Sequence, residues 1–93
     1  MRVRVKLVSL LRDAVDGAGE VIVEIDGDKA RLRDVLEKLY ASHPKLKRLV
    51  GGLEERGLGV VYMVNGQGAG LDAEVKDGDL VAILPPASGG AGS

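Results

Sequence analysis

The stretch most able to do chemistry closes the sequence, and it has no charge and no large apolar side chain. It reads Pro85-Pro86-Ala87-Ser88-Gly89-Gly90-Ala91-Gly92-Ser93. Two prolines hold the start of this stretch rigid, whereas the small residues after them allow many backbone conformations. A thin thread of this kind can enter a narrow channel and present a carboxylate to another enzyme. A frayed terminus without a function is the alternative, and composition alone favours it.

The remaining side chains exclude most catalytic and metal-binding classes. The chain has no cysteine and one histidine, so disulfides, cysteine nucleophiles and thiolate or imidazole metal clusters are excluded. His43 precedes Pro44 and is expected to be a helix-end residue rather than a ligand. Residues 66–70 lack the Lys-Ser/Thr pair that follows a phosphate loop. Asp77 and Asp79 supply too few carboxylate ligands for a calcium loop. We therefore expect no bound cofactor, no metal and no catalytic constellation.

Length, charge and composition predict one small domain in the cytoplasm. A chain of 93 residues fits a single folding unit, and 45% hydrophobic residues can supply its core. The formal net charge of −1 does not favour a nucleic-acid partner. No apolar stretch approaches the ~20 residues that a membrane span needs, so we expect no membrane partner. The absence of cysteine agrees with a cytoplasmic location.

Four segments with regularly placed or continuous apolar residues predict the strands that must position the C-terminal stretch. Residues 2–7 alternate polar and apolar side chains, so that Val3, Val5 and Leu7 face a core. Turn residues between 13 and 19 make the first two strands a hairpin. The predicted strands cover residues 2–7, 21–25, 60–64 and 80–84.

A helical spacing of apolar residues begins near Arg31 and ends by His43, which predicts the main helix. After Pro44 we expect at most one further turn, to residue 50, and then a loop over 51–59. The order of elements predicts an α+β fold, a mixed sheet of four to five strands with this helix packed on one face. With the first and last strands parallel at the centre, this is the ubiquitin-like β-grasp, with residues 1–86 as the domain and 87–93 as a flexible tail.

Five short segments occur in the order found in a known protein family. They are Leu11–Asp13, residues 32–36, Val64-Asn65-Gly66, residues 76–81 and residues 84–90. In this order, and with the Pro-Pro-x-Ser-Gly-Gly ending, the chain resembles the small subunit of molybdopterin synthase and the related thiamin sulfur carriers (MoaD/ThiS-like, ubiquitin-like proteins). The resemblance covers nearly the whole chain.

The resemblance implies a sulfur carrier without catalytic residues of its own. In the family, an E1-like partner uses ATP to adenylate the terminal glycine carboxylate, which then becomes a thiocarboxylate. Carried over to this sequence, the reactive glycine is Gly90, and Gly89 gives clearance beside it. In the molybdopterin branch the thiocarboxylate enters the large subunit of molybdopterin synthase and donates sulfur for the dithiolene that binds molybdenum or tungsten. The Pro-Pro-x-Ser-Gly-Gly ending favours this branch over that of the thiamin sulfur carriers, which supply sulfur for a thiazole (the thiazole branch).

The chain departs from the family pattern after Gly90, because Ala91, Gly92 and Ser93 follow it. While that peptide bond is intact, Gly90 has no carboxylate to activate. We favour a precursor trimmed by a protease; a relative that does not use the thiocarboxylate route, and residues foreign to the natural protein, are the alternatives. Two further functions stay open: a protein modifier attached through Gly90 to target lysines, and a plain binding module with an inert tail.

The predicted strands also place an apolar patch on the face of the sheet that the helix does not cover. If Val3, Val5 and Leu7 face the helix, the side chains that alternate with them face outward. The predicted partner-binding residues are Val8, Val61, Met63, Leu84, Pro85, Pro86 and Ser88. An exposed apolar patch on a small protein marks a partner surface. The alternative is that the loop over residues 51–59 covers this face.

Overall fold

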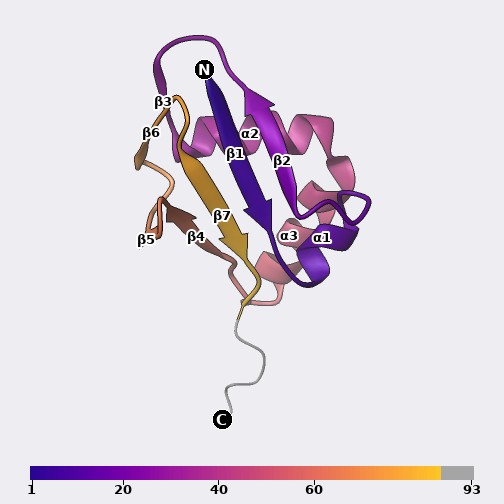
Figure 1. The fold of residues 1–93 in the computed structure, drawn as a ribbon. Coiled ribbons are helices and arrows are strands. Elements are labelled where there is room, and N and C mark those ends of the chain that lie inside the picture. Colours follow the sequence, from indigo (N-terminus) through magenta and orange to yellow (C-terminus); the bar gives the residue numbers. More distant parts are fainter. Residues whose placement is uncertain (87–93) are drawn as a thin grey trace.

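The computed structural model describes residues 1–86. They form a five-stranded sheet, a separate two-stranded sheet, and helices on one side of the larger sheet (Figure 1). The elements in chain order are β1 (Arg2–Leu7), α1 (Leu10–Asp13), β2 (Glu20–Glu24), β3 (Lys29–Arg31), α2 (Leu32–Ser42), α3 (Pro44–Glu55), β4 (Val61–Val64), β5 (Gln67–Gly68), β6 (Glu74–Lys76) and β7 (Leu80–Leu84). The sheet has the order β2-β1-β7-β4-β5, and β3 pairs separately with β6.

The first and last strands pair in parallel at the centre of the sheet. Val5 lies opposite Val81 and Leu7 opposite Ile83, and all of these side chains are buried. On the outer sides of this pair, β1 pairs antiparallel with β2, and β7 pairs antiparallel with β4. Since side chains alternate between the two faces of a strand, the residues between the buried ones point to the opposite, open face. The predicted α+β fold with a central parallel pair is confirmed.

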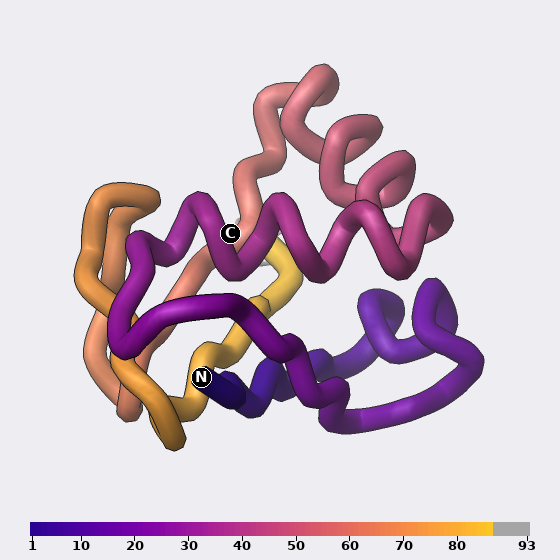
Figure 2. Tube along the Cα trace, turned by 90° about the horizontal axis from the view of Figure 1, so that it is seen from above, coloured from indigo at the N-terminus to yellow at the C-terminus, as the bar shows by residue number. Residues whose placement is uncertain are grey.

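The helix α2 covers the core face of the sheet (Figure 2). Its buried side chains recur with helical spacing and are Leu32, Val35, Leu36 and Leu39. The Asp34 carboxylate accepts a hydrogen bond from the Arg31 backbone N–H at 3.0 Å, which ties the residue before the helix to its first turn. Burying one Leu or Val side chain contributes about 1.5–3 kcal/mol, so aliphatic residues alone can build this core.

The expectation of a single turn after Pro44 and a loop from Gly51 is wrong. The helix α3 runs for 12 residues and passes through Gly51 and Gly52. Its buried Leu46 and Val50 are four positions apart, and their packing outweighs the weak helix propensity of the two glycines. The helix ends instead at Glu55, two residues before Gly57, whose φ of +78° is favourable for glycine.

The hydrogen bonds at Gly57 are those of a Schellman motif. The Gly57 N–H donates to the Glu54 carbonyl at 2.9 Å, and the Leu58 N–H donates to the Leu53 carbonyl at 2.8 Å. These bonds satisfy carbonyl groups of the last turn that would otherwise lack partners. Gly57, rather than Gly51, is therefore the residue that stops the helix.

The structure also contains four short elements: α1, β3, β5 and β6. The strand β3 pairs with β6 so that Ala30 lies opposite Val75, and the pair carries an ion pair between Lys29 and Glu74 at 3.5 Å. Elements of two to four residues show no hydrophobic period. They form because neighbouring segments supply their partners.

Within residues 1–86, none of the helices has the length and apolar character needed to cross a membrane. Residues 87–93 lie outside the described part of the chain. The limit between the domain and the tail at residue 86 therefore stays a prediction.

The glycines within α3 give the first test of this fold. No heavy atom beyond the helix lies within 4 Å of a Cβ added at Gly51 or Gly52, and neither has a positive φ. Gly51→Ala and Gly52→Ala should each raise the free energy of unfolding by about 0.5–1 kcal/mol, because alanine loses less backbone entropy. Urea denaturation followed by circular dichroism measures this change.

Gly57→Ala is the matched control for these two variants. A side chain at a φ of +78° is strained, so this variant should lower the free energy of unfolding by about 1 kcal/mol. Destabilisation by alanine at both Gly51 and Gly52 would show that α3 does not continue through them.

Candidate functional site

The candidate site is the end of β7, where the chain leaves the sheet. The strand β7 lies between β1 and β4, and its last residue, Leu84, pairs opposite Val61 at the start of β4. Pro85 and Pro86 follow directly and are half-buried. Each proline fixes its own φ and favours an extended conformation in the residue before it. The chain therefore departs from the centre of the sheet in an extended direction.

Apolar side chains surround this exit on the open face. Val61 lies opposite Leu84, and Met63 lies opposite Ala82, so these side chains share one face of the sheet. Lys6 of β1 lies opposite Ala82 on this face. Val8 comes two positions after Lys6, just beyond the end of β1, so continued alternation would place it on the same face. We call Val8, Val61, Met63 and Leu84 the open-face patch.

The open-face patch is accessible in the described part of the chain. Val61 is 49% exposed, and the other three side chains are half-buried. Residues 51–55, part of the segment expected to cover the patch, belong instead to α3 on the helix side of the sheet (Figures 1 and 2). The register thus brings Val61, Met63 and Leu84 together on one face, and Val8 directly follows the end of β1.

Two further apolar side chains flank the same end of the sheet. Leu10 begins α1, just after β1, and is 41% exposed; Leu58 precedes β4 and is 43% exposed. Sequence reasoning missed both, because neither belongs to a strand with a readable alternation.

Two cations border the open-face patch. Arg4 and Lys6 of β1 are exposed and alternate with its buried valines. Among residues 1–86, neither side chain forms an ion pair. An apolar area beside unpaired positive charge complements a partner surface with an apolar centre and an acidic rim.

Three predicted site residues lie outside the described part of the chain: Ser88, Gly89 and Gly90. Pro85 and Pro86 are the last described residues, and they fix where the site begins. The roles of the two glycines rest on the sequence and are treated as proposals below.

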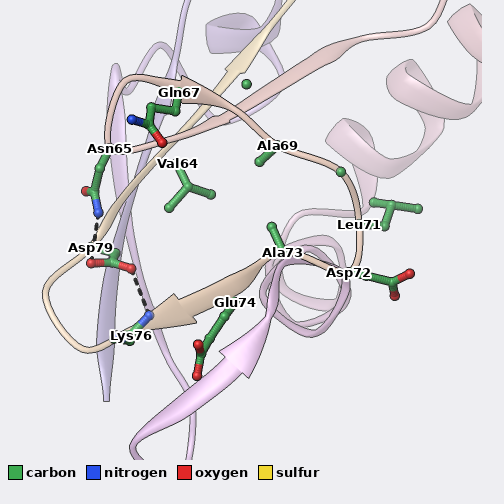
Figure 3. A pocket seen from close by; sticks show the side chains of 12 residues that line it. Val64, Asn65, Gln67, Ala69, Leu71, Asp72, Ala73, Glu74, Lys76 and Asp79 are labelled. Atoms are coloured by element: carbon green, nitrogen blue, oxygen red, sulfur yellow. Dashed lines mark hydrogen bonds between the residues drawn. The ribbon is translucent and has the colours of Figure 1, made fainter.

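Several of the segments that carried the family resemblance meet at the other end of β7 (Figure 3). Asn65 donates its side-chain N–H to the Asp79 carboxylate at 3.0 Å and accepts the Leu80 N–H at 3.0 Å. Asp79 also accepts the Lys76 backbone N–H at 2.8 Å. The Lys76 bond, and then the Asn65 bond, lower the pKa of Asp79. These residues join β4, β6 and β7, so their role is structural.

The groove beside this cluster has a volume of about 810 Å³ and carries three carboxylates that already have partners. Asp72 pairs with Arg31 and Arg33, and Glu74 pairs with Lys29. Asp79 is held by the bonds described above. Within residues 1–86, no cluster of three or more His, Asp or Glu side chains is arranged to hold a metal.

A second cavity, of about 500 Å³, lies between α2, α3 and β4. Burial is the main cause that raises the pKa of both Tyr40 and Tyr62 in its wall. The two hydroxyl groups are near enough to influence each other, yet the buried Tyr40 Oη has no hydrogen-bond partner at suitable geometry among the described residues. This cavity lies on the helix side, away from the exit of β7.

Comparison with known proteins gives consistent results. A model of the ThiS family matches residues 5–90. Small archaeal modifier protein 1 of Haloferax volcanii is 38% identical over 77 residues, which cover 82% of this chain and 87% of that protein.

Two solved structures show the same fold. A Pyrococcus furiosus protein, provisionally named molybdopterin converting factor subunit 1, has a TM-score of 0.73 and 32% identity, with coverage of 94% of this chain and 99% of that one. A chain of the BexX/CysO complex of Amycolatopsis orientalis has a TM-score of 0.64 and 26% identity, with coverage of 94% and 98%.

The Asp79 cluster gives a prediction in acid. Because its pKa is lowered in the folded state, Asp79 contributes stability above its unfolded pKa of about 3.9, and this contribution is lost as the pH falls through the folded pKa. Asp79→Asn should therefore be less stable than the wild type at neutral pH and lose less stability on acidification. Thermal unfolding followed from about pH 7 to pH 3 measures both effects.

Asp28→Asn is the control, since Asp28 makes no hydrogen bond or ion pair within residues 1–86. It should leave the acid dependence unchanged. Equal acid dependence of the wild type and Asp79→Asn would contradict the role given to this carboxylate.

Proposed function

The chain belongs to the ThiS family, and on this basis we propose that it is a sulfur carrier whose C-terminal glycine is activated by a partner enzyme. The observation that supports this most is the exit of the chain from the centre of the sheet beside the open-face patch. A partner that binds the patch holds Pro86 at a fixed place. From there Gly90 can reach at most about 14 Å into the partner, since an extended chain advances about 3.3–3.6 Å per residue.

The chemistry at Gly90 needs an activating partner. A carboxylate is a poor electrophile, so an E1-like enzyme would join it to AMP from ATP and release pyrophosphate. A sulfur nucleophile would then displace AMP and leave a thiocarboxylate. The carrier supplies the electrophilic carbon and no catalytic side chain, and Gly89 leaves room for the enzyme to approach the backbone. This activation would take place in the cytoplasm.

The first candidate for the sulfur acceptor is a pterin precursor. In this role the chain is the small subunit of molybdopterin synthase, and its thiocarboxylate enters the large subunit to supply the dithiolene sulfur. The Pyrococcus relative, named after a molybdopterin converting factor subunit, supports this candidate. The BexX/CysO complex supports docking of the domain on a second protein.

A processing step precedes activation in this proposal. A protease would remove Ala91, Gly92 and Ser93, because Gly90 carries a free carboxylate only after that cleavage.

The second candidate is a protein modifier, favoured by the 38% identity to small archaeal modifier protein 1. Adenylation of Gly90 is the same in both candidates, and the difference lies in the acceptor. Attack by a lysine amine on the activated carbonyl would displace the leaving group and form an isopeptide bond. A carrier of the thiazole branch would differ in the sulfur acceptor alone.

Leu84→Glu tests the docking role of the open-face patch. Leu84 is half-buried on the open face, so the variant should stay folded by circular dichroism. A carboxylate at the centre of the interface should lower the rate of ATP-dependent activation at least about 30-fold, the loss of one anchor of about 2 kcal/mol. All variants are made in chain 1–90, whose Gly90 carries a free carboxylate, and pyrophosphate exchange with the E1-like enzyme of the same cell measures this rate.

Leu71→Glu is the matched control for this variant. Leu71 is 47% exposed and lines the cavity on the helix side, so this change should leave activation within about two-fold of the wild type. Normal activation of Leu84→Glu would contradict a role of the patch in docking.

The length of the tail gives a separate prediction. Chain 1–90, incubated with the activating enzyme, ATP and sulfide, should gain about 16 Da as sulfur replaces oxygen. Chain 1–93 should gain no mass, because its Gly90 carbonyl is an amide. Equal activation of the two chains would contradict Gly90 as the reactive residue, and lysine-linked conjugates of chain 1–90 would favour the modifier.

A further inference from the structure

The strand β2 forms one edge of the five-stranded sheet, at the opposite side from β4 and β5 (Figure 1). It pairs only with β1, and β1 separates it from β7 and β4. A partner at this edge therefore would not compete for the end of β7. An uncovered edge strand is also a place where an extended segment of another protein can add to a sheet.

The register shows which backbone groups of β2 are free. The Leu7 N–H donates to the Gly19 carbonyl at 2.9 Å, and the Ile25 N–H donates to the Met1 carbonyl at 3.0 Å. Hydrogen-bonded and non-hydrogen-bonded positions alternate in an antiparallel pair, so the odd-numbered residues between 19 and 25 bond to β1. The backbone N–H and C=O groups of Glu20, Ile22 and Glu24 therefore point to the free edge.

A small cavity lies next to this edge, between β2 and the C-terminal part of α2. Its volume is about 280 Å³, and its wall is made by residues 21–24 and by Lys38, Leu39, Ser42 and His43. Side chains of an added strand alternate between the two faces of the sheet. Those that point to the helix side would enter this cavity.

The side chains on the open face of β2 define the chemistry of the added strand. Glu20, Ile22 and Glu24 are all exposed, and Ile22 is 42% exposed. Glu24 forms a long ion pair of 3.9 Å with Arg2, and both side chains stay 70% exposed or more. An exposed pair of this kind contributes little, so Glu24 is still available to a further cation. The edge thus presents an acidic, an apolar and an acidic side chain.

This pattern disfavours a second copy of the chain at the edge. An antiparallel pair of two β2 strands centred on Ile22 would place Glu20 opposite Glu24 of the other copy. Like charges directly opposite each other destabilise a strand pair, and charged residues on edge strands prevent self-association. The same pattern favours a strand with the opposite charges.

We propose that β2 binds an extended segment of a partner protein, which adds to the sheet as a sixth strand. The segment carries a basic, an apolar and a basic side chain at alternating positions, opposite Glu20, Ile22 and Glu24. Its backbone bonds to the free N–H and C=O groups of those residues, and a small side chain from its other face enters the cavity beside α2. The edge and the open-face patch can then hold two partners at once.

A synthetic peptide tests this proposal by NMR. Ser-Thr-Lys-Thr-Val-Thr-Lys-Thr-Ser is titrated into the isotope-labelled full chain. Binding at the edge should slow amide hydrogen exchange at least about ten-fold at Glu20, Ile22 and Glu24. Val21 and Val23 already bond to β1, so their exchange should not change. A peptide with Glu in place of both lysines should bind at least about ten-fold more weakly.

Ile22→Pro and Ile22→Thr are the matched variants. Proline removes an edge N–H that β1 does not use, so the pairing with β1 should survive, as the NMR spectrum shows directly. Peptide affinity should fall at least about ten-fold in Ile22→Pro and stay within about three-fold in Ile22→Thr. If proline unfolds the domain, the double variant Glu20→Lys with Glu24→Lys takes its place and should prefer the acidic peptide.

Three outcomes would overturn the proposal. The first is the absence of exchange protection at the three edge amides at saturating peptide. The second is equal binding of the basic and acidic peptides by the wild type. The third is protection that appears on β7 and β4 instead of β2, which would assign the peptide to the open-face patch.

Discussion

The parallel pairing of β1 with β7 sets where everything else in the structure lies. It joins the first strand of the chain to the last, with Val5 opposite Val81 and Leu7 opposite Ile83 in the core. Parallel strands end at the same edge of a sheet, so the end of β1, the end of β7 and the start of β4 lie together. The open-face patch and the exit at Pro85 meet there because of this pairing.

The placement of the helices on one side leaves the other face available. The apolar side chains of α2 and α3 are buried in one core on the same side of the sheet. The buried core residues are Val and Leu with one Ile. The open face carries the patch beside Arg4 and Lys6, and β2 carries the opposite charge at the sheet edge. One small sheet thus offers two surfaces of different chemistry, which meet where Lys6 of β1 lies opposite Glu20 of β2.

Sequence reasoning worked where a single element carries its own pattern. The alternation of Val3, Val5 and Leu7 and the helical spacing of Leu32 to Leu39 each follow from burial of one face. The faces of Val61, Met63 and Leu84 followed from the same alternation, and the register confirms them. The short strands β3, β5 and β6 could not be predicted in this way, because distant partners define them. The helix α3 was missed because the packing of Leu46 and Val50 outweighs two glycines, and only the structure shows that packing.

For the candidate site as well, some features could be predicted from the sequence and others are shown only by the structure. Asn65 and Asp79 belong to segments shared with the family, yet their contact across 14 positions shows a role in holding strands together. Gly89 and Gly90 were recognised from the motif alone, since a reactive backbone carboxylate leaves no side-chain pattern. The intact mass of the protein isolated from its native cell tests their role most directly. The account predicts a chain that ends at Gly90, part of it with sulfur in place of one oxygen; a chain that ends at Ser93 as the only form would contradict it.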